Sequence, residues 1–212
     1  MPYSAKTGPG DRYVDALRFA IASHVEPDGT PQLRKGTNVP YLSHLLSVSA
    51  LVWEAGGDED QAIAGLLHDT IEDTDTTAEE LRELFGAEVA RLVVACSDGD
   101  AESDGQSPPR DATTWRSRKE ACVAHLEQTD IRPKLVTAAD KLHNATAIVT
   151  DAESDIEEPG EASVWVRFNA SPTDIVWYYE AVLAALRPDL DGTPLLRRLI
   201  QAVERMKELA PR

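Results

Sequence analysis

The sequence contains only two cysteines, Cys96 and Cys122, among its 212 residues. A core of this length holds together without a disulfide, so we expect two buried free thiols, although a pair between them stays open. Long hydrophobic runs are also missing, since no stretch approaches the roughly 20 apolar residues that span a bilayer. Residues 1–10 lack the basic and then apolar pattern of a secretory signal. These absences predict a cytoplasmic protein with no membrane partner.

Positive charge is scarce as well. The chain has 37 acidic residues against 21 basic ones, which gives a net charge of −16. This balance argues against general binding to DNA or RNA, whose phosphates attract a basic surface. A small anionic substrate is still compatible with it, because a bound divalent metal inverts the local field. Much of the acidity falls in residues 98–104 and 151–161, where Ser, Gly and Pro predict solvated loops.

The period-two alternation of β-strands is absent too, and helical periodicity dominates. Residues Tyr13, Leu17, Ala20, Ile21 and Val25 recur at spacings of three and four, as one buried helix face requires. We therefore predict an all-α, single-domain helical bundle over residues 1–212, with its core at about 11–187 and a C-terminal helix at 193–209.

The other expected helices can be placed along the chain. They cover residues 40–56, 62–75, 78–85, 89–96, 115–128 and 133–149, with two more in 162–186 that divide near Ser171-Pro172. Thr77 and Glu80 form a T-x-x-E capping box before residue 78.

Four residues with metal-binding side chains fall on three of these helices. His44 lies in the second helix, His68 and Asp69 are adjacent in the third, and Asp140 lies deep in a later one. Two histidines and two carboxylates offer mixed nitrogen and oxygen ligation, which suits Mn, Fe or Zn better than a thiolate site. Metal sites between facing helices of a bundle are well precedented. The pattern indicates one divalent metal site.

An acidic turn follows the adjacent pair. Glu72 comes four residues after His68, and Asp73 four after Asp69, so each pair stacks on one side of a helix. Three carboxylates and a histidine crowded together repel one another unless a cation is present. With a metal in place, the second turn can orient or deprotonate water, which favours Glu72 and Asp73 as catalytic residues.

The ordered set His44, His68-Asp69, Asp140 resembles the H…HD…D signature of the HD superfamily of metal-dependent phosphohydrolases. More narrowly, the blocks at residues 41–44, 68–74 and 139–144 are similar to the hydrolase domain of the RelA/SpoT homologues, above all the stand-alone small alarmone hydrolases. The matching region spans about residues 16–186. The resemblance implies an HD-type bundle that removes the 3′-pyrophosphate from (p)ppGpp, usually with Mn²⁺, while Zn²⁺ or Fe²⁺ stay open.

The resemblance also implies roles for individual residues. His44, His68, Asp69 and Asp140 would hold the metal. Glu72 and Asp73 would position and activate the attacking water. The residues expected to bind the nucleotide are Arg34, Lys35 and Asn144.

Elementary chemistry adds further candidates, since phosphoryl cleavage needs cations that hold the phosphates. Arg118, Lys119 and Lys141 qualify in an otherwise acidic chain. Arg167 and Tyr178 or Tyr179 stand in an aromatic cluster that is expected to line the substrate pocket. For His24, His125 and His143 we expect structural or surface roles.

Two departures from the family pattern leave the substrate open. The family often carries an arginine one turn before the tyrosine, whereas the residue four before Tyr178 is Asp174. The stretch at residues 36–39 is about one residue longer than usual. The alternatives are an HD phosphohydrolase acting on another nucleotide, such as a nucleotidase or an NADPH phosphatase, and a catalytically silent nucleotide-binding sensor. A homo-oligomer stays open too.

Overall fold

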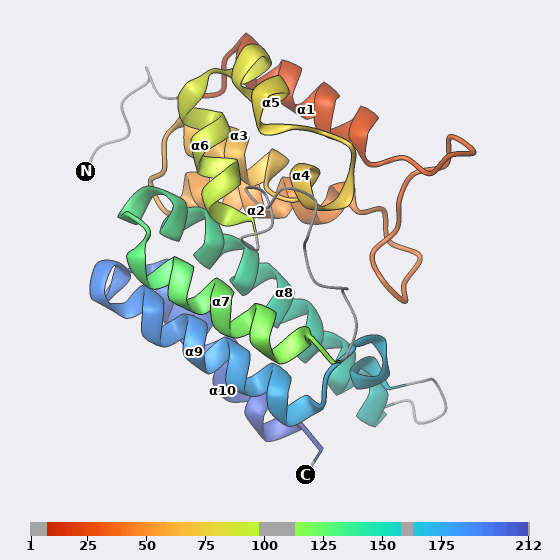
Figure 1. The fold of residues 1–212 in the computed structure, drawn as a ribbon. Coiled ribbons are helices and arrows are strands. Elements are labelled where there is room, and N and C mark those ends of the chain that lie inside the picture. Colours follow the sequence, from red (N-terminus) through yellow and green to blue (C-terminus); the bar gives the residue numbers. More distant parts are fainter. Residues whose placement is uncertain (1–7, 98–112, 158–162, 212) are drawn as a thin grey trace.

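Helices make up the regular structure of this protein (Figure 1). The computed structural model describes residues 8–97, 113–157 and 163–211, and within these ranges no strand occurs. Two isolated β-bridges, Val25 with Pro31 and Leu33 with Pro40, close the loop after the first helix. The all-α prediction is confirmed.

The helices follow one another with short connections. They are α1 (Asp11–Ser23), α2 (Leu42–Glu54), α3 (Glu59–Leu67), α4 (Thr70–Asp73), α5 (Ala78–Phe85), α6 (Ala87–Cys96), α7 (Trp115–Gln128), α8 (Ile131–Glu157), the 3₁₀ helix η2 (Val164–Arg167), α9 (Pro172–Leu190) and α10 (Pro194–Leu209).

Helix α8 is the central element of the bundle. It packs against α2, α3 and α6 on one side and against α9 and α10 on the other, and Figure 1 shows it running between the two groups. Ala138, Ala139, Leu142 and Ala145 are almost fully buried in this helix. Small side chains let neighbouring helices approach closely, so residues of α2, α3 and α8 can meet at one point.

Most predicted helix starts agree with the structure. The Thr77 hydroxyl accepts a hydrogen bond from the Glu80 backbone N–H at 3.2 Å, which is one of the two bonds of the expected capping box. The predicted division at Ser171-Pro172 is confirmed, since Ser171 caps α9 and Pro172 occupies its first turn.

The third predicted helix, however, is wrong as a continuous element. Helix α3 ends at Leu67 and α4 begins at Thr70, so His68 and Asp69 form the junction between the two helices. The Thr70 hydroxyl donates to the Leu67 carbonyl oxygen at 2.6 Å. In a continuing helix a backbone N–H would bond this oxygen, so the hydroxyl takes the place of that bond at the end of α3.

Two other boundaries differ from the prediction. Helix α8 begins at Ile131, before the expected Pro133, because proline is tolerated in a first turn where its missing N–H has no partner to lose. It also continues through residue 157, so residues 151–157 are helical and not the expected loop. Residues 158–161 and the acidic segment 98–104 lie outside the described residues.

Cys96 and Cys122 are both free thiols, as expected, and each is half-buried. They line one small cavity between α6 and α7, with a volume of about 30 Å³. Burial raises the pKa of the Cys96 thiol to about 11, so this thiol stays protonated at neutral pH.

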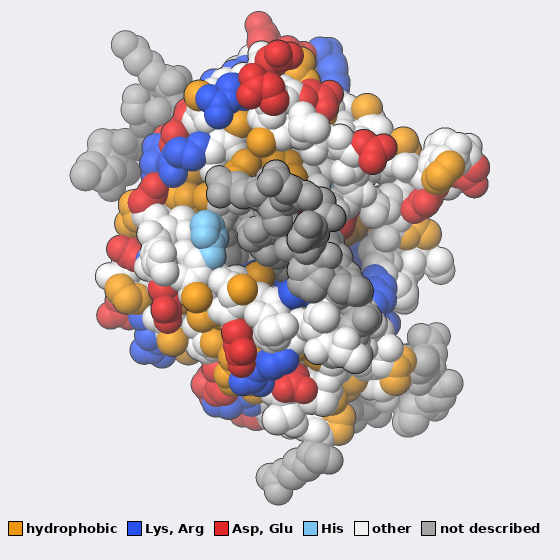
Figure 2. All heavy atoms as spheres, viewed as in Figure 1, with side chains coloured by type: hydrophobic (Ala, Val, Ile, Leu, Met, Phe, Trp, Pro, Cys, Tyr) orange, Lys and Arg blue, Asp and Glu red, His pale blue; other side chains and the backbone are white. Residues whose placement is uncertain are grey.

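The surface of the bundle carries charges of both signs. On the face in Figure 2, acidic and basic side chains are interspersed and form no continuous basic patch on the coloured area. None of the described helices is both long and apolar enough to cross a membrane.

A tight helix contact holds the C-terminal end of α3, next to His68, against α2. Gly65 lies against α2, where an added Cβ would come within 3.1 Å of Ser49 Cα. That neighbour is backbone, so it cannot rotate away.

We predict that Gly65→Ala lowers the free energy of unfolding by about 1–2 kcal/mol. Overpacking costs about 1–3 kcal/mol, and the better helix propensity of alanine returns up to about 1 kcal/mol. Urea unfolding measures the difference, and Gly8→Ala, where a Cβ meets nothing within 4 Å, is the control. An unchanged or raised stability of Gly65→Ala would contradict the close contact.

Candidate metal centre and nucleotide pocket

Two histidines and two carboxylates converge where α2, α3 and α8 meet. The potential ligand atoms of His44, His68 and Asp140 all lie within 4.8 Å of one another, and all three residues are buried. The Nε2 atoms of the two histidines are 3.3 Å apart. Asp140 Oδ1 lies 3.3 Å from Nε2 of His44 and 3.6 Å from that of His68.

Asp69 completes this group of four. Its Oδ2 lies 3.0 Å from Nε2 of His68 and 3.6 Å from Nε2 of His44. His68 and Asp69 both lie at the junction between α3 and α4. The residues predicted from the sequence as metal ligands are thus together in space.

The other ring nitrogen of each histidine has a partner outside the group. His68 Nδ1 lies 3.1 Å from the Gly65 carbonyl oxygen, which only accepts, so Nδ1 carries the proton and donates it. His44 Nδ1 lies 2.8 Å from His143 Nδ1. Burial and the neighbouring His44 lower the pKa of His143 to about 4, so its ring is neutral and can accept from His44. Both Nε2 atoms then point their lone pairs into the group, as metal ligation requires.

The charges in this group call for a cation. Although burial opposes it, the carboxylates of Asp69 and Asp140 hold the pKa of His68 well above its ordinary range. The pKa values of both carboxyls are held well below theirs despite burial, Asp69 chiefly by His68 and Asp140 chiefly by Lys141. The buried carboxylate of Asp140 and the half-buried one of Asp69 around the two Nε2 atoms therefore need either a proton or a metal ion between them. The donor set fits a divalent metal with mixed nitrogen and oxygen ligands.

Tyr41, at the start of α2, lies beside the four side chains of His44, His68, Asp69 and Asp140, which together form the metal group. Its hydroxyl donates a short hydrogen bond to Asp69 Oδ2. Burial, followed by the charge of Asp69, raises the pKa of Tyr41 well above its usual value, so the hydroxyl keeps its proton. His24 stacks on the Tyr41 ring with centroids 5.0 Å apart, and its Nδ1 lies 2.7 Å from Gln32 Oε1. Tyr41 was not among the residues predicted for the site, although its place three residues before His44 puts both on one helix face.

Asn144 connects Asp140 to the expected nucleotide-binding residues. Its Nδ2 donates to Asp140 Oδ1, and its Oδ1 accepts from Arg34 Nη2 at 2.8 Å. Lys141 Nζ lies 2.8 Å from Asp140 Oδ2. Asn144 follows Asp140 by one helical turn, which explains their contact.

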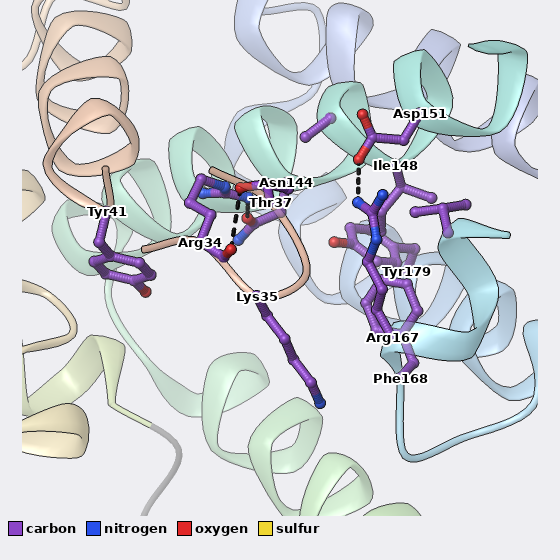
Figure 3. Close-up of a pocket in the computed structure, with 12 residues that line it drawn as sticks. Arg34, Lys35, Thr37, Tyr41, Asn144, Ile148, Asp151, Arg167, Phe168 and Tyr179 are labelled. Atoms are coloured by element: carbon purple, nitrogen blue, oxygen red, sulfur yellow. Dashed lines mark hydrogen bonds and ion pairs between the residues drawn. The ribbon is translucent and has the colours of Figure 1, made fainter. Parts of the chain in front are cut away.

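A cavity of about 290 Å³ opens beside the metal group. Tyr41 and Asn144, which bond to Asp69 and Asp140, are part of its wall. The complete lining is Arg34, Lys35, Thr37, Tyr41, Asn144, Ala147, Ile148, Asp151, Val164, Arg167, Phe168 and Tyr179. In Figure 3, Arg34 and Asn144 lie between Tyr41 on one side and the Asp151–Arg167 pair on the other, while Lys35 extends away from them.

The remaining predicted substrate residues divide into two groups. Arg34, Lys35, Asn144 and Arg167 line the cavity, whereas Tyr178 does not, and its neighbour Tyr179 lines it instead.

Arg118 and Lys119 lie on α7, outside the cavity lining. Arg118 Nε bonds Thr114 Oγ1 at 3.4 Å, and Lys119 Nζ lies 5.0 Å from the centroid of the Tyr178 ring. Lys141 Nζ lies 5.7 Å from the same ring. Both lysines therefore lie near the Tyr178 ring.

Glu72 and Asp73, the predicted catalytic pair, line a separate open hollow between α1 and α4. The charge of Asp73 contributes to the raised pKa of Tyr41, which itself bonds Asp69. The backbone N–H of Asp73 donates to the Asp69 carbonyl oxygen at 2.9 Å, which fixes the short helix α4 to the ligand-bearing break.

Of the structural and surface roles expected for the other histidines, the structural one fits His143, which is half-buried and contacts His44. The sequence placed it three residues after Asp140, but only the packing of α2 on α8 brings it to His44. His24 is buried against Tyr41, which agrees with a structural role.

Asp174, which stands where the family often has an arginine, pairs with an arginine from another helix. Arg116 Nη1 lies 3.2 Å from Asp174 Oδ1, and the Arg116 guanidinium stacks on Trp177 at 3.2 Å. The departure from the family pattern therefore has a structural use in joining α7 to α9.

Fold and site together define the class of this protein as an all-α bundle with a group of histidines and carboxylates between its helices that could hold a metal ion. The HD domain family matches residues 16–175, and the chain belongs to this family.

Several curated proteins are similar to this chain. A protein of Myxococcus xanthus named GTP pyrophosphokinase is 42% identical over 113 residues, which cover 53% of this chain and 14% of that protein. The Danio rerio protein named guanosine-3′,5′-bis(diphosphate) 3′-pyrophosphohydrolase MESH1 is 37% identical over 123 residues, 57% of each chain. Its Drosophila melanogaster namesake is 32% identical over 141 residues, 65% of this chain and 70% of that protein. The matched region thus spans about a seventh of the Myxococcus xanthus protein and somewhat over half of the Danio rerio protein.

Solved structures share the fold. The structure described as "A metazoan ortholog of SpoT hydrolyzes ppGpp and plays a role in starvation responses" superposes with a TM-score of 0.64 over 96% of this chain and 99% of that one, at 24% identity. The structure of lmo0812 from Listeria monocytogenes has a TM-score of 0.61 over 80% of this chain and 99% of that one, at 28% identity.

We predict that Mn²⁺ raises the Tm more at about pH 8 than at about pH 6. In the metal-free protein, the raised pKa of His68 contributes stability that is present below about pH 6.5 and lost as pH rises through the folded-state pKa. The lowered pKa values of Asp69 and Asp140 contribute stability that is lost only in acid. A metal replaces the departing proton, so its benefit grows with pH.

Thermal unfolding with and without Mn²⁺ at the two pH values measures this effect. His68→Ala serves as the control and should lose the Tm gain at both. A gain that is equal at both pH values, or larger at the lower one, would contradict the charge arrangement.

We also predict that Tyr41→Phe weakens Mn²⁺ binding about tenfold with little change in fold. The substitution removes only the hydroxyl that orients Asp69, and residues that orient metal ligands typically contribute 10- to 100-fold in affinity. A Mn²⁺ titration measures the change. Tyr13→Phe, which removes a hydroxyl 2.8 Å from Ser49 Oγ, is the matched control, and equal affinities of the two variants would refute the role of Tyr41.

Proposed function

We propose that this protein is a metal-dependent (p)ppGpp 3′-pyrophosphohydrolase, with Mn²⁺ as its metal. The curated MESH1 relatives carry this activity in their names, and the HD domain covers residues 16–175 here. One observation carries the proposal most directly. The group of His44, His68, Asp69 and Asp140 is joined to a cationic cavity by the Tyr41–Asp69 and Asn144–Asp140 hydrogen bonds.

The cavity supplies what a highly charged nucleotide requires. Arg34 is half-buried and fixed by Asn144, so its guanidinium is in place before a ligand arrives. Lys35 is exposed and extends away from Arg34, free of that anchor (Figure 3). In the proposal, Arg34 and Lys35 hold phosphates and the nucleotide base region, and Asn144 keeps Asp140 and Arg34 at a fixed distance.

The metal ligands would be His44, His68, Asp69 and Asp140. When bound there, a divalent cation supplies Lewis acidity toward a phosphoryl oxygen and lowers the pKa of water. Mn²⁺ suits the set of two imidazoles and two carboxylates.

Glu72 and Asp73 would handle the proton of the attacking water. Both carboxylates lie on α4, directly after His68 and Asp69, and the charge of Asp73 contributes to the raised pKa of Tyr41. In the proposed reaction, the water oxygen bonds to the phosphorus of the 3′-pyrophosphate next to the ribose, and the bond between that phosphorus and the ribose 3′ oxygen breaks. Asp73 accepts one proton of the water, and the 3′ oxygen takes up a proton to become the 3′ hydroxyl of GDP, so that ppGpp and water give GDP and pyrophosphate.

Product analysis tests the proposal. The purified chain with Mn²⁺ is incubated separately with ppGpp, NADPH and a panel of nucleoside mono- and triphosphates. GDP and pyrophosphate from ppGpp are expected. Phosphate released from another member would keep the HD chemistry and discard the alarmone, and no cleavage of any member would favour a sensing role.

We predict that Asp73→Asn lowers the ppGpp turnover rate by at least about 100-fold and leaves Mn²⁺ affinity within about twofold. General-base catalysis typically contributes 10²- to 10⁴-fold, and Asp73 is not one of the metal-binding four. Asp75→Asn is the matched control, because Asp75 lines the same hollow and is exposed. A near-native rate for Asp73→Asn would show that another group takes the proton.

A further inference from the structure

The far end of the cavity differs chemically from the end at the metal group. Asp140, Asn144, Ile148 and Asp151 follow one another along α8 at spacings of four, four and three, so they share one helix face. A rise of 1.5 Å per residue places Asp151 about 16 Å beyond Asp140. The cavity wall therefore runs from the metal group along α8 to Asp151.

The walls at this far end are mostly apolar. Ile148 and Val164 are almost fully buried, and Phe168 and Tyr179 add two aromatic rings to the lining. Flat apolar walls with a few fixed polar groups are typical of sites that bind an aromatic ring system.

The polar groups at this end are one carboxylate and one guanidinium. Arg167 Nη1 forms a short ion pair with Asp151 Oδ2, which Figure 3 shows beside the cavity. The two side chains are 22% and 36% exposed, so a ligand can reach both. A guanidinium has five N–H donors and a carboxylate about four acceptor sites, so one contact between them leaves capacity on each.

The loop before α2 packs against Arg167 and holds it in position. Gly36 has a φ of +72°, and a Cβ there would come within 2.7 Å of Arg167 Cδ. The aliphatic part of Arg167 thus lies directly against the loop that carries Arg34 and Lys35. This contact sets the guanidinium beside the residues proposed to hold the nucleotide.

We infer that Asp151 and Arg167 read the base of the nucleotide and select guanine, an inference that rests on the proposed function for the placement of the phosphates. Guanine carries adjacent N1–H and N2–H donors, which a carboxylate accepts as a pair, and its O6 and N7 accept from an arginine fork. Adenine instead turns the N1 lone pair toward the carboxylate and lacks the N2 amine. Asp151 therefore discriminates by repulsion as well as by attraction.

Nucleotide binding to the full chain with Mn²⁺ tests this assignment. GDP, IDP and ADP are the probes, since IDP lacks only the N2 amine of GDP. A good bidentate contact corresponds to about 5- to 150-fold in affinity. We expect GDP to bind at least about tenfold more tightly than ADP, and IDP to fall between them.

Asp151→Asn should reduce the GDP preference over IDP and ADP to within about threefold. Glu153→Gln on the same helix is the matched control, because Glu153 pairs with Arg205 away from the cavity and should keep the full preference. If Asp151→Asn does not fold, the ratio of GDP to IDP affinity in the unmodified chain still decides, because equal affinities would overturn the inference.

The inference and the proposed function can fail separately. A chain that cleaves ppGpp but binds GDP and ADP equally, or keeps its GDP preference in Asp151→Asn, overturns the base reading and leaves the hydrolase proposal standing. A chain that cleaves no ppGpp but loses its GDP preference in Asp151→Asn supports the base reading alone. Absence of GDP binding to the unmodified chain overturns the inference.

Discussion

The mutual repulsion of buried groups at the meeting point of α2, α3 and α8 is the constraint on which the rest of the structure depends. Two carboxylates and two imidazole lone pairs occupy a space in which the ligand atoms of His44, His68 and Asp140 lie within 4.8 Å. Such a group is costly in a low-dielectric interior unless a positive charge sits within it. A positive charge is therefore required at this point of the core, and the elements around the four side chains prevent them from moving apart to avoid the repulsion.

The surrounding contacts show how rearrangement is prevented. Each histidine is held through its second ring nitrogen, His68 by the Gly65 carbonyl and His44 by His143. The carboxylate of Asp69 is held by Tyr41. These contacts fix the direction of each ligand before any ion binds, so little conformational freedom is lost on binding.

The sequence predicted His44, His68, Asp69 and Asp140 as metal ligands from their types and order, and the structure brings these four side chains together. The same reasoning expected one regular helix over residues 62–75, since its apolar periodicity continues through the break. Helix α3 instead ends with a hydrogen bond from the Thr70 hydroxyl to the Leu67 carbonyl oxygen. The spacing of apolar residues does not indicate such a bond.

Other parts of the site depend on tertiary packing and could not be predicted. His143 reaches His44 only because α2 crosses α8 at that level, and neither helix alone encodes the crossing. Adjacent residues on a helix point about 100° apart, so the choice between Tyr178 and Tyr179 for the cavity wall depends on how α9 is rotated. The pairing of Asp151 with Arg167 was hidden for a further reason, because residues 151–161 were expected to be loop and not the end of α8.

Because the net charge is −16, a bound metal would also affect how an anionic substrate binds. An acidic protein repels a polyphosphate at long range, and a few basic side chains do not reverse that field. Arg34 and Lys35 provide positive charge locally, but Arg167 is already paired with Asp151. A divalent ion inside the group of two histidines and two carboxylates would cancel the negative charge nearest to the cavity. Substrate affinity and catalysis are then coupled through one ion, because the cation that activates water also makes the pocket attractive to an anion.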